Sequence, residues 1–387
     1  MPVQVSPSKI ALSFAIVAAA SFASVSASAA GMDPTPERLV LQPGGIPTGS
    51  DGKPITNCGG IAGNPEIVLN APFPKDSKPN NFSCRPDNIA WRNMMSELGM
   101  AIAPTAFHPA RTTGFGGFSL TIEAAFTSIN SNAMSTATDG TKRQYWHDGT
   151  QGSVDPNSKQ YSIVNNSPDS ILQVYSLKAR KGLPLGFEVV GALGYMANTS
   201  LWVGGADIRW AMLEGFRTGF LGYMPDVSIG TGVRTLGGSS KFFLTTVGID
   251  VAVSKPFAIA DSGKLTPYVG FQRVIIFADS TIIDTTPNVD PLQRCGYTGA
   301  DPQTGAPMCR NKLSDGKTPD NSDFNNNVTF NKARIHRNRI MAGLNYRYEI
   351  MYVAGQFMTD ITDPSSENEN LFGGRQWTTV FEAGVFF

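Results

Sequence analysis

The sequence predicts an all-β fold, an antiparallel transmembrane β-barrel of about ten strands, within a range of roughly 8 to 14. From Gly117 onward, segments of about ten residues alternate apolar with polar or small residues, as half-buried strands do. No uninterrupted apolar stretch reaches the roughly 18 residues that a membrane-spanning helix needs. The composition agrees: 16% of the 387 residues are charged, 40 are Gly and 10% are aromatic, which disfavours long helices and a disordered chain.

Residues 1–30 are predicted to be a secretory signal peptide. Lys9 precedes an apolar run from Ile10 to Ala20, and the small-residue motif Ala27-Ser28-Ala29 follows, which is the order of regions in such a leader. The run is too short to span a bilayer, so we expect cleavage near Ala29 or Ala30 and export through the general secretory route. No Cys follows at the position that a lipid anchor would use, so we expect no lipoprotein.

Residues 31–116 are predicted to form an N-terminal periplasmic or plug segment that is irregular and tied by a disulfide. Residues 31–86 are rich in Pro, Gly and Asn and have little periodicity. One short amphipathic helix is expected after Asp87, ending before Pro104. Its apolar face would carry Trp91, Met94, Met95, Leu98 and Ile102, and its polar face Arg92, Asn93, Ser96 and Glu97. The helix would either enter the barrel or lie beneath its mouth on the inner leaflet.

The four cysteines allow three pairings. If the N-terminal segment is periplasmic and residues 280–333 lie outside the cell, topology permits Cys58 with Cys84 and Cys295 with Cys309. Each disulfide would contribute roughly 3 kcal/mol by closing a loop of the unfolded chain. A metal site is the rival interpretation, but the pairs lack CxxC spacing and a nearby His. We therefore expect no metal and no cofactor.

The barrel is predicted over residues 117–387. The expected strands are 118–127, 169–180, 187–196, 200–212, 226–236, 242–254, 265–279, 334–347, 350–360 and 377–387. Outer-membrane barrels have short inner turns and longer outer loops. If the first strand runs outward, the two longest connections, 130–168 and 280–333, both fall on the outer side.

Turns and charges then predict the register of two hairpins. A two-residue turn at Tyr348-Glu349 would pair Arg347 with Ile350. A turn at Asn198-Thr199 would place Glu188 opposite Arg209, as a candidate ion pair in the lumen. Alternation breaks around residues 268–276, which predicts a β-bulge there.

The last eight residues, 380–387, alternate apolar positions and end on Phe. They resemble the C-terminal signal of bacterial outer-membrane β-barrel proteins, carried here by Trp377, Phe381, Val385 and Phe387. The resemblance implies recognition by the barrel-assembly machinery and insertion into the lipid of a Gram-negative outer membrane. A soluble β-sandwich is the alternative, but its second face would be richly charged, whereas here single charges mix with Gly, Ala, Ser and Thr.

Motifs for other functions are incomplete. Residues 323–327 resemble the first part of a calcium-binding loop, but Arg334 stands where a bidentate Glu is required. Adventitious binding of calcium at the surface remains the alternative. His147-Asp148, beside Tyr145 and Trp146, could be half of a surface protease or hydrolase site. A loop His next to Asp is usually solvated, however, and no G-x-S-x-G motif occurs, so we expect no enzyme. With 31 basic and 31 acidic residues and no clustered basic face, we expect no binding of nucleic acid.

Single charges on the polar face of the strands are the remaining candidates for function. They are Glu123, Glu188, Asp207, Arg209, Asp226, Arg234, Asp250, Arg273, Arg339, Arg347 and Glu382. Lining a lumen, they would set the selectivity of a narrow channel or uptake protein for a small polar or amphipathic solute. The alternative is a structural or adhesion barrel whose outer loops, 130–168 and 280–333, bind a surface partner. The oligomeric state is not predicted.

Overall fold

The protein is a closed antiparallel β-barrel of ten strands. The computed structural model describes residues 31–41, 85–105, 108–138, 140, 142–154, 162–214, 224–259, 263–284, 297–300, 302–303, 307–309, 327–361, 363–368 and 370–387. The wall strands are β3 (Phe118–Ser128), β8 (Ile171–Gly182), β9 (Phe187–Met196), β10 (Trp202–Leu213), β11 (Asp226–Gly237), β12 (Phe242–Ser254), β14 (Gly263–Ser280), β19 (Ala333–Tyr348), β20 (Met351–Asp360) and β21 (Trp377–Phe386). The last strand pairs with the first, and β12 pairs with β14, which closes the ring. The predicted antiparallel barrel and the number of its strands are confirmed.

The wall has an apolar exterior, because strand residues alternate between exposed and buried positions. Leu193 and Phe381, on the outer face, remain 62% and 57% exposed. Aromatic pairs cover the same face, among them Phe126 with Tyr175 and Phe357 with Trp377. Large apolar side chains on the outside and polar ones within are what a barrel surrounded by lipid requires.

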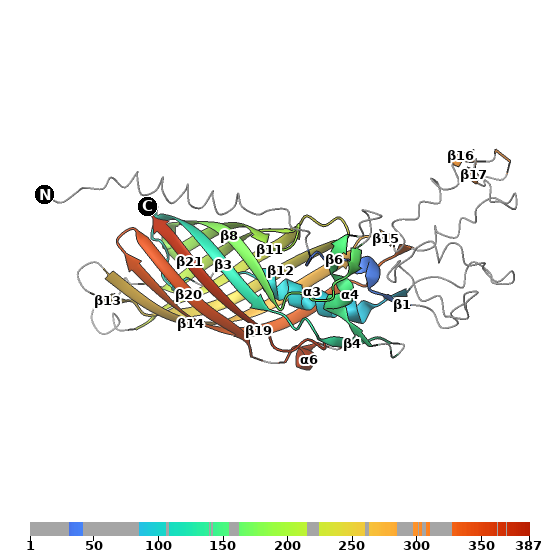
Figure 1. Ribbon diagram of the computed structural model, residues 1–387. Coiled ribbons are helices and arrows are strands. Elements are labelled where there is room, and N and C mark those ends of the chain that lie inside the picture. The colour runs from blue at the N-terminus through green and yellow to red at the C-terminus, as the bar shows by residue number, and fades with distance from the viewer. Residues whose placement is uncertain are drawn as a thin grey trace.

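The two ends of the barrel differ (Figure 1). The C-terminus and β13 (Phe257–Ile259), a short strand added to β14, lie at one end, and the small elements of the long loops lie at the other. Because long loops lie outside, we call the latter the outer end. The small elements there are β4 (Met134–Thr136), β5 (Lys142–Gln144), α4 (Tyr145–Gly149), β6 (Gln151–Val154), β7 (Ser162–Val164), β15 (Ile283–Asp284), β16 (Tyr297–Ala300), β17 (Pro307–Cys309), β18 (Asn327–Val328) and α6 (Pro364–Glu367).

The described part of the N-terminal segment begins at the outer end. It contains η1 (Pro36–Arg38), β1 (Val40–Leu41) and β2 (Arg85–Pro86). The Met32 amide donates to the carbonyl of Asn198 in an outer turn, and the Thr35 amide to that of Gly149 in the loop after β3. Residues 31–41 therefore lie at the end of the barrel that carries the long loops, and not at the end with the C-terminus. The topological ground for choosing among the three cysteine pairings is lost, since both long loops and residues 31–41 share one end.

Helix α3 (Asn88–Ile102) descends from this outer end into the barrel. Asp87 caps it as predicted, accepting a hydrogen bond of 2.9 Å from the Ala90 amide, and it ends before Pro104. Trp91 stacks on Phe330 with ring centroids 4.9 Å apart. The expected polar face is buried as well, including Asn93, Ser96 and Glu97, because the barrel wall surrounds the helix. Within the described residues, no helix combines the length and apolar character that a bilayer crossing demands.

The helix also explains why the alternation of residues in β14 (Gly263–Ser280) led to a wrong prediction. Strand β14 has no bulge, since its register with β12 and β19 is continuous. Its inner face is apolar at Val274, Ile276 and Ala278 because α3 packs there. A Cβ atom at Gly99 of α3 would lie 2.5 Å from Cγ2 of Ile276. Over residues 274–278 both faces of β14 are therefore apolar, one toward lipid and one toward the helix.

The two predicted hairpin registers differ in outcome. Glu188 does lie opposite Arg209. In the other hairpin Arg347 pairs with Tyr352 rather than with Ile350, because the turn is Glu349-Ile350, with Glu349 at φ 50°. That shift of two residues keeps each side chain on its predicted face, so alternation could not have detected it.

Candidate functional site: the filled lumen

The lumen is filled by two consecutive pieces of the chain. We call the part occupied by α3 the upper lumen. The chain then continues as residues 103–105 and 108–116, which we call the lumen segment and which contain no helix or strand. This segment reaches the inner end, where the Gly116 amide donates to the carbonyl of Gly182 at the end of β8. The N-terminal segment therefore runs through the barrel from the outer end to the inner end.

In the upper lumen, Glu97 joins the helix to the loop that follows β3. Its carboxylate accepts hydrogen bonds from the Tyr145 hydroxyl (2.6 Å), the Trp146 indole nitrogen (2.8 Å) and the Asn130 amide (3.1 Å). Glu97 is completely buried, and this desolvation raises the pKa of its carboxyl group despite those donors. The loop after β3 is thus fixed to the helix by one buried acid.

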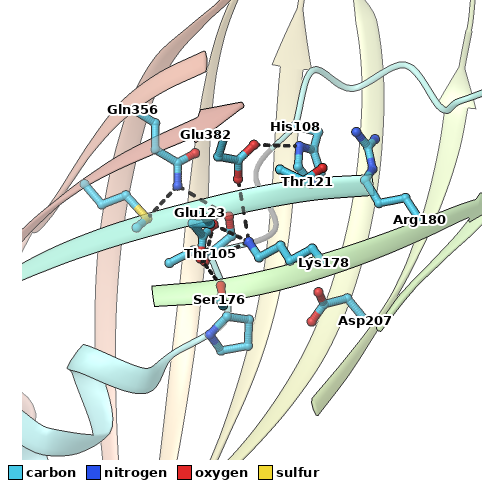
Figure 2. A network of polar contacts seen from close by, with 12 residues as sticks. Thr105, His108, Thr121, Glu123, Ser176, Lys178, Arg180, Asp207, Gln356 and Glu382 are labelled. Carbon is cyan, nitrogen blue, oxygen red and sulfur yellow. Dashed lines mark hydrogen bonds and ion pairs between the residues drawn. The ribbon is translucent and has the colours of Figure 1, made fainter. Parts of the chain in front are cut away.

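The wall beside the lumen segment carries a buried polar network (Figure 2). The Lys178 ammonium forms an ion pair with Glu123, and its Nζ lies 3.6 Å from a carboxylate oxygen of Glu382. The Thr105 hydroxyl of the lumen segment donates to Glu123 at 2.8 Å. His108 Nδ1, also from the lumen segment, lies 3.2 Å from the Glu382 carboxylate. Side chains of the segment are therefore members of the network.

Two wall arginines bind the backbone of the lumen segment. Arg339 donates to the carbonyl of Pro104 at 2.8 Å and to the side chain of Gln272 at 2.6 Å. Gln272 also donates to the Pro104 carbonyl, at 3.1 Å. Arg209 donates to the carbonyl of His108 at 3.0 Å. These guanidinium groups take the place of the missing secondary-structure partners of the segment.

The remaining charges of the wall are largely paired with one another. Arg180 makes a bidentate contact with Glu188, and Arg234 with Asp207, at distances of 2.5 to 3.1 Å. Arg209 Nη2 lies 3.8 Å from Asp250 across β11. A Cβ at Gly230, which stands between them, would lie 2.8 Å from Asp250. Glu188 and Arg209 are neighbours in register, as predicted, but Glu188 makes its bidentate contact with Arg180.

The lower part of the lumen segment is held in the same way. The Ala110 amide donates to the Ser254 hydroxyl at 2.9 Å, and the Thr113 amide to Glu188 at 2.9 Å. Arg111 forms an ion pair with Asp226 at 3.3 Å. A cavity of about 20 Å³, room for about one water molecule, remains between the end of α3 and the wall. The described lumen is closed to solutes at this level.

Most of the predicted lumen residues do face inward. Nine are buried on the inner face: Glu123, Glu188, Asp207, Arg209, Asp226, Arg234, Asp250, Arg339 and Glu382. Arg347 stands at a position of β19 that alternation turns inward, but it is exposed at the inner mouth of the barrel. Its guanidinium there lies 4.2 Å from the Phe386 ring centroid. Arg273 was misplaced and lies on the outward face of β14, since the expected bulge that would have turned it inward does not exist.

Several lumen groups were not predicted. Lys178 and Arg180 share the inner face of β8 with Ser176, so alternation alone could have identified them. His108 and Thr105 carried no signal, because they lie in a segment without periodicity. The predicted assembly-signal residues Trp377, Phe381 and Val385 lie along the outward face of β21, and Phe387 follows its end.

The other predicted features lie apart from the lumen or outside the described residues. His147 Nε2 is 3.1 Å from the side-chain oxygen of Asn132, and Asp148 is 3.6 Å from Arg143. Cys58, Cys84 and Cys295 are outside the described residues, as is the predicted calcium-like opening before Asn327. Both disulfides therefore stay predictions.

The comparisons with known proteins concern the barrel alone. No protein-family model and no curated protein matches the chain. The N-terminal β-barrel domain of Pseudomonas aeruginosa OprF is similar at 10% identity and a TM-score of 0.26, over 70% of this chain and 97% of that one. Outer membrane protein OprG of the same bacterium gives 8% and 0.26, over 72% and 99%. Outer membrane protease OmpT of Escherichia coli gives 7% and 0.33, over 70% and 95%.

The geometry of the chain itself defines what it is. Ten antiparallel strands close on one another, large apolar side chains cover the exterior, and the charged side chains turn inward. The chain is a closed ten-stranded β-barrel with an apolar exterior, and its own N-terminal segment occupies the lumen.

Proposed function

We propose that the protein is a narrow outer-membrane channel or uptake protein for a small polar or amphipathic solute. In the described state, α3 and the lumen segment close the path. Eight strands leave an interior that side chains just fill, and sixteen to eighteen leave an open channel. A barrel of ten strands can therefore provide a narrow path for a solute once the N-terminal segment moves out of the lumen.

One observation carries this proposal: charged residues of the wall bind the lumen segment, which has no secondary structure. Arg339 and Arg209 hold backbone carbonyls of the lumen segment, and these could be exchanged for water or for a polar solute. The buried ion pairs of the wall are weak evidence for stability, because well-packed apolar residues often stabilise an interior equally well or better. The buried charges of the lumen therefore add little stability. A polar lumen of this kind is better suited to the passage of a solute than to the sealed interior of a structural barrel.

A surface partner is the second candidate function. Residues at the outer end form an ordered platform in which the Gln151 amide donates to the carbonyl of Asp33, and Arg38 donates to that of Thr150 at 3.1 Å. An ordered outer surface favours recognition of a partner, as expected for an adhesion barrel. We propose no enzymatic role for His147 and Asp148.

The route to the membrane is part of the same proposal. The leader of residues 1–30 supports export through the general secretory route. The outward face of β21, with its aromatic residues, supports recognition by the barrel-assembly machinery.

The test is single-channel conductance of the refolded full chain in a planar bilayer at rising urea concentrations. We expect no steps without urea, and ion-selective steps when urea releases the N-terminal segment while the strands stay folded by circular dichroism. Arg209→Ala with Arg339→Ala should change the ion selectivity of those steps. Arg273→Ala, which removes an outward arginine, is the matched control and should not. Silence from folded protein at every urea concentration would contradict the channel and leave the outer platform as the functional surface.

A further inference from the structure

The outward face of the wall carries very few charges. Among the ten described wall strands, the outward-facing charged side chains are Lys181 at the inner end of β8, Arg273 and Asp279 on β14, and Arg334 on β19. Three of the four therefore lie on one strand pair. Such a concentration is unlike the rest of an exterior made for lipid.

These two strands also reach beyond their neighbours. Strand β14 has 18 residues and β19 has 16, whereas β9, β20 and β21 have 10 each. Arg273 stands ten positions after Gly263, the inner end of β14. Ten residues of a strand tilted by about 40° rise about 25 Å, which is the height of the apolar band of such barrels. Arg273 thus lies at the outer boundary of that band, and Arg334 lies beyond it.

Neither arginine has an anionic partner among the residues that the structure describes. Asp279 forms an ion pair with Lys332, whose ammonium lies 2.9 Å from its carboxylate. The Arg334 guanidinium lies 5.7 Å from the ring centroid of Phe277. Within the described residues, neither Arg273 nor Arg334 has a carboxylate at ion-pair distance. Arg273 stands opposite Asn338 and Phe277 opposite Arg334, so the arginines flank the pair of Ile275 and His336.

We infer that this stripe, Arg273 and Arg334 with the ring of Phe277, binds the phosphate group of a phosphorylated lipid in the outer leaflet. A guanidinium presents a planar fork of donors that fits a phosphate in bidentate fashion. An arginine at the edge of the apolar band carries a desolvation cost that an anionic headgroup at the same height offsets. Outward Phe271 and Ile275 offer the acyl chains an apolar surface just below and between the arginines.

The test is native mass spectrometry of the refolded full chain in micelles doped with lipid A, a glycolipid that carries phosphate groups. We expect a one-to-one adduct. The double variant Arg273→Ala/Arg334→Ala should bind about tenfold more weakly, the size of losing charge-assisted contacts. Lys181→Ala, an outward cation at the opposite end, should bind as the wild type does. Arg273→Lys/Arg334→Lys should lie between, because it keeps the charges and loses the fork.

Two competitors identify the ligand. Dephosphorylated lipid A should form no comparable adduct, and inorganic phosphate should not displace lipid A. Equal binding by the double variant or by the dephosphorylated lipid would overturn the inference, and displacement by inorganic phosphate would overturn the choice of a lipid. The substitutions are on the lipid side of the wall, so these results are independent of whether the lumen conducts.

Discussion

The upper and lower lumen are closed by the same stretch of chain, but in different ways. In the upper lumen, α3 buries Trp91, Met94, Met95 and Leu98 against the wall and the outer loops. In the lower lumen, the lumen segment is held by charged side chains and through its own backbone carbonyls. Apolar burial contributes net stability, whereas buried ion pairs roughly offset their own desolvation. The upper closure should therefore be strong, and the lower closure weak and exchangeable.

Removing the largest apolar contact should have the greatest effect. Trp91 is fully buried, stacks on Phe330 and meets Phe242 edge-on with centroids 5.8 Å apart. Trp91→Ala should cost about 3–5 kcal/mol. Urea titration followed by conductance should show channel steps at lower urea than in the wild type. Trp202→Ala, an outward tryptophan that is 49% exposed, is the control and should move the midpoint far less. Equal shifts would contradict the view that the upper lumen is the strong closure.

The buried acid of α3 should come next. Glu97→Ala would leave the Tyr145 hydroxyl, the Trp146 indole and the Asn130 amide without their acceptor. We expect a loss of about 3 kcal/mol of stability, because buried donors would be orphaned. Glu97→Gln should cost less: its oxygen can accept from Trp146 and Asn130, and its amide can donate to the hydroxyl of Tyr145. Equal losses in both variants, measured by urea unfolding, would show that the three hydrogen bonds do not fix the helix.

A methyl group added to α3 tests how closely the helix fits. In Gly99→Ala the new Cβ would lie 2.5 Å from Cγ2 of Ile276 on β14. Overpacking of this kind costs about 1–3 kcal/mol. Adding Ile276→Ala should recover part of the loss, a coupling that a double-mutant cycle measures. Gly191→Ala, where a Cβ meets nothing within 4 Å, should be neutral. An additive cycle would mean that the helix does not press on β14.

Gly99 also shows why the contents of the lumen were harder to predict than its wall. Each wall strand meets lipid on one face, so a period of two could be recognised in the nine strands other than β14. The inner face of β14 meets the helix instead of polar groups, so its alternation failed and suggested both a bulge and an inward Arg273. No periodicity marks the lumen segment, and a shift of two residues in the last hairpin leaves every face unchanged. Such features depend on contacts distant in the chain.

In the lower lumen, replacing a charge should cost less stability than replacing Trp91 and should alter passage. Arg339→Met keeps the volume of the side chain, and Gln272 would still donate to the Pro104 carbonyl. We expect a loss of about 1–2 kcal/mol, because the buried side-chain oxygen of Gln272 loses its donor. The channel steps seen in urea should favour anions less than those of the wild type, because a cation of the path is gone. A loss as large as that of Trp91→Ala would contradict the distinction between the two regions.

The smallest effect should be the response of the upper closure to pH. Burial raises the pKa of Glu97, so the folded chain holds this proton to a higher pH than the unfolded chain. The stability that comes from this proton is present in full below the unfolded pKa and is lost as pH rises through the raised folded pKa. Other acids titrate in the same range, so the difference between the wild type and Glu97→Gln isolates this one.

Urea midpoints from acid to neutral pH should therefore show the wild type falling relative to Glu97→Gln as pH rises, and then running parallel to it. A difference that grew in the opposite direction would mean that the three donors outweigh burial at this carboxylate. A constant difference would mean that they balance it. In either case acidification would not tighten the upper lumen against the lower, and in the first case it would loosen the upper closure.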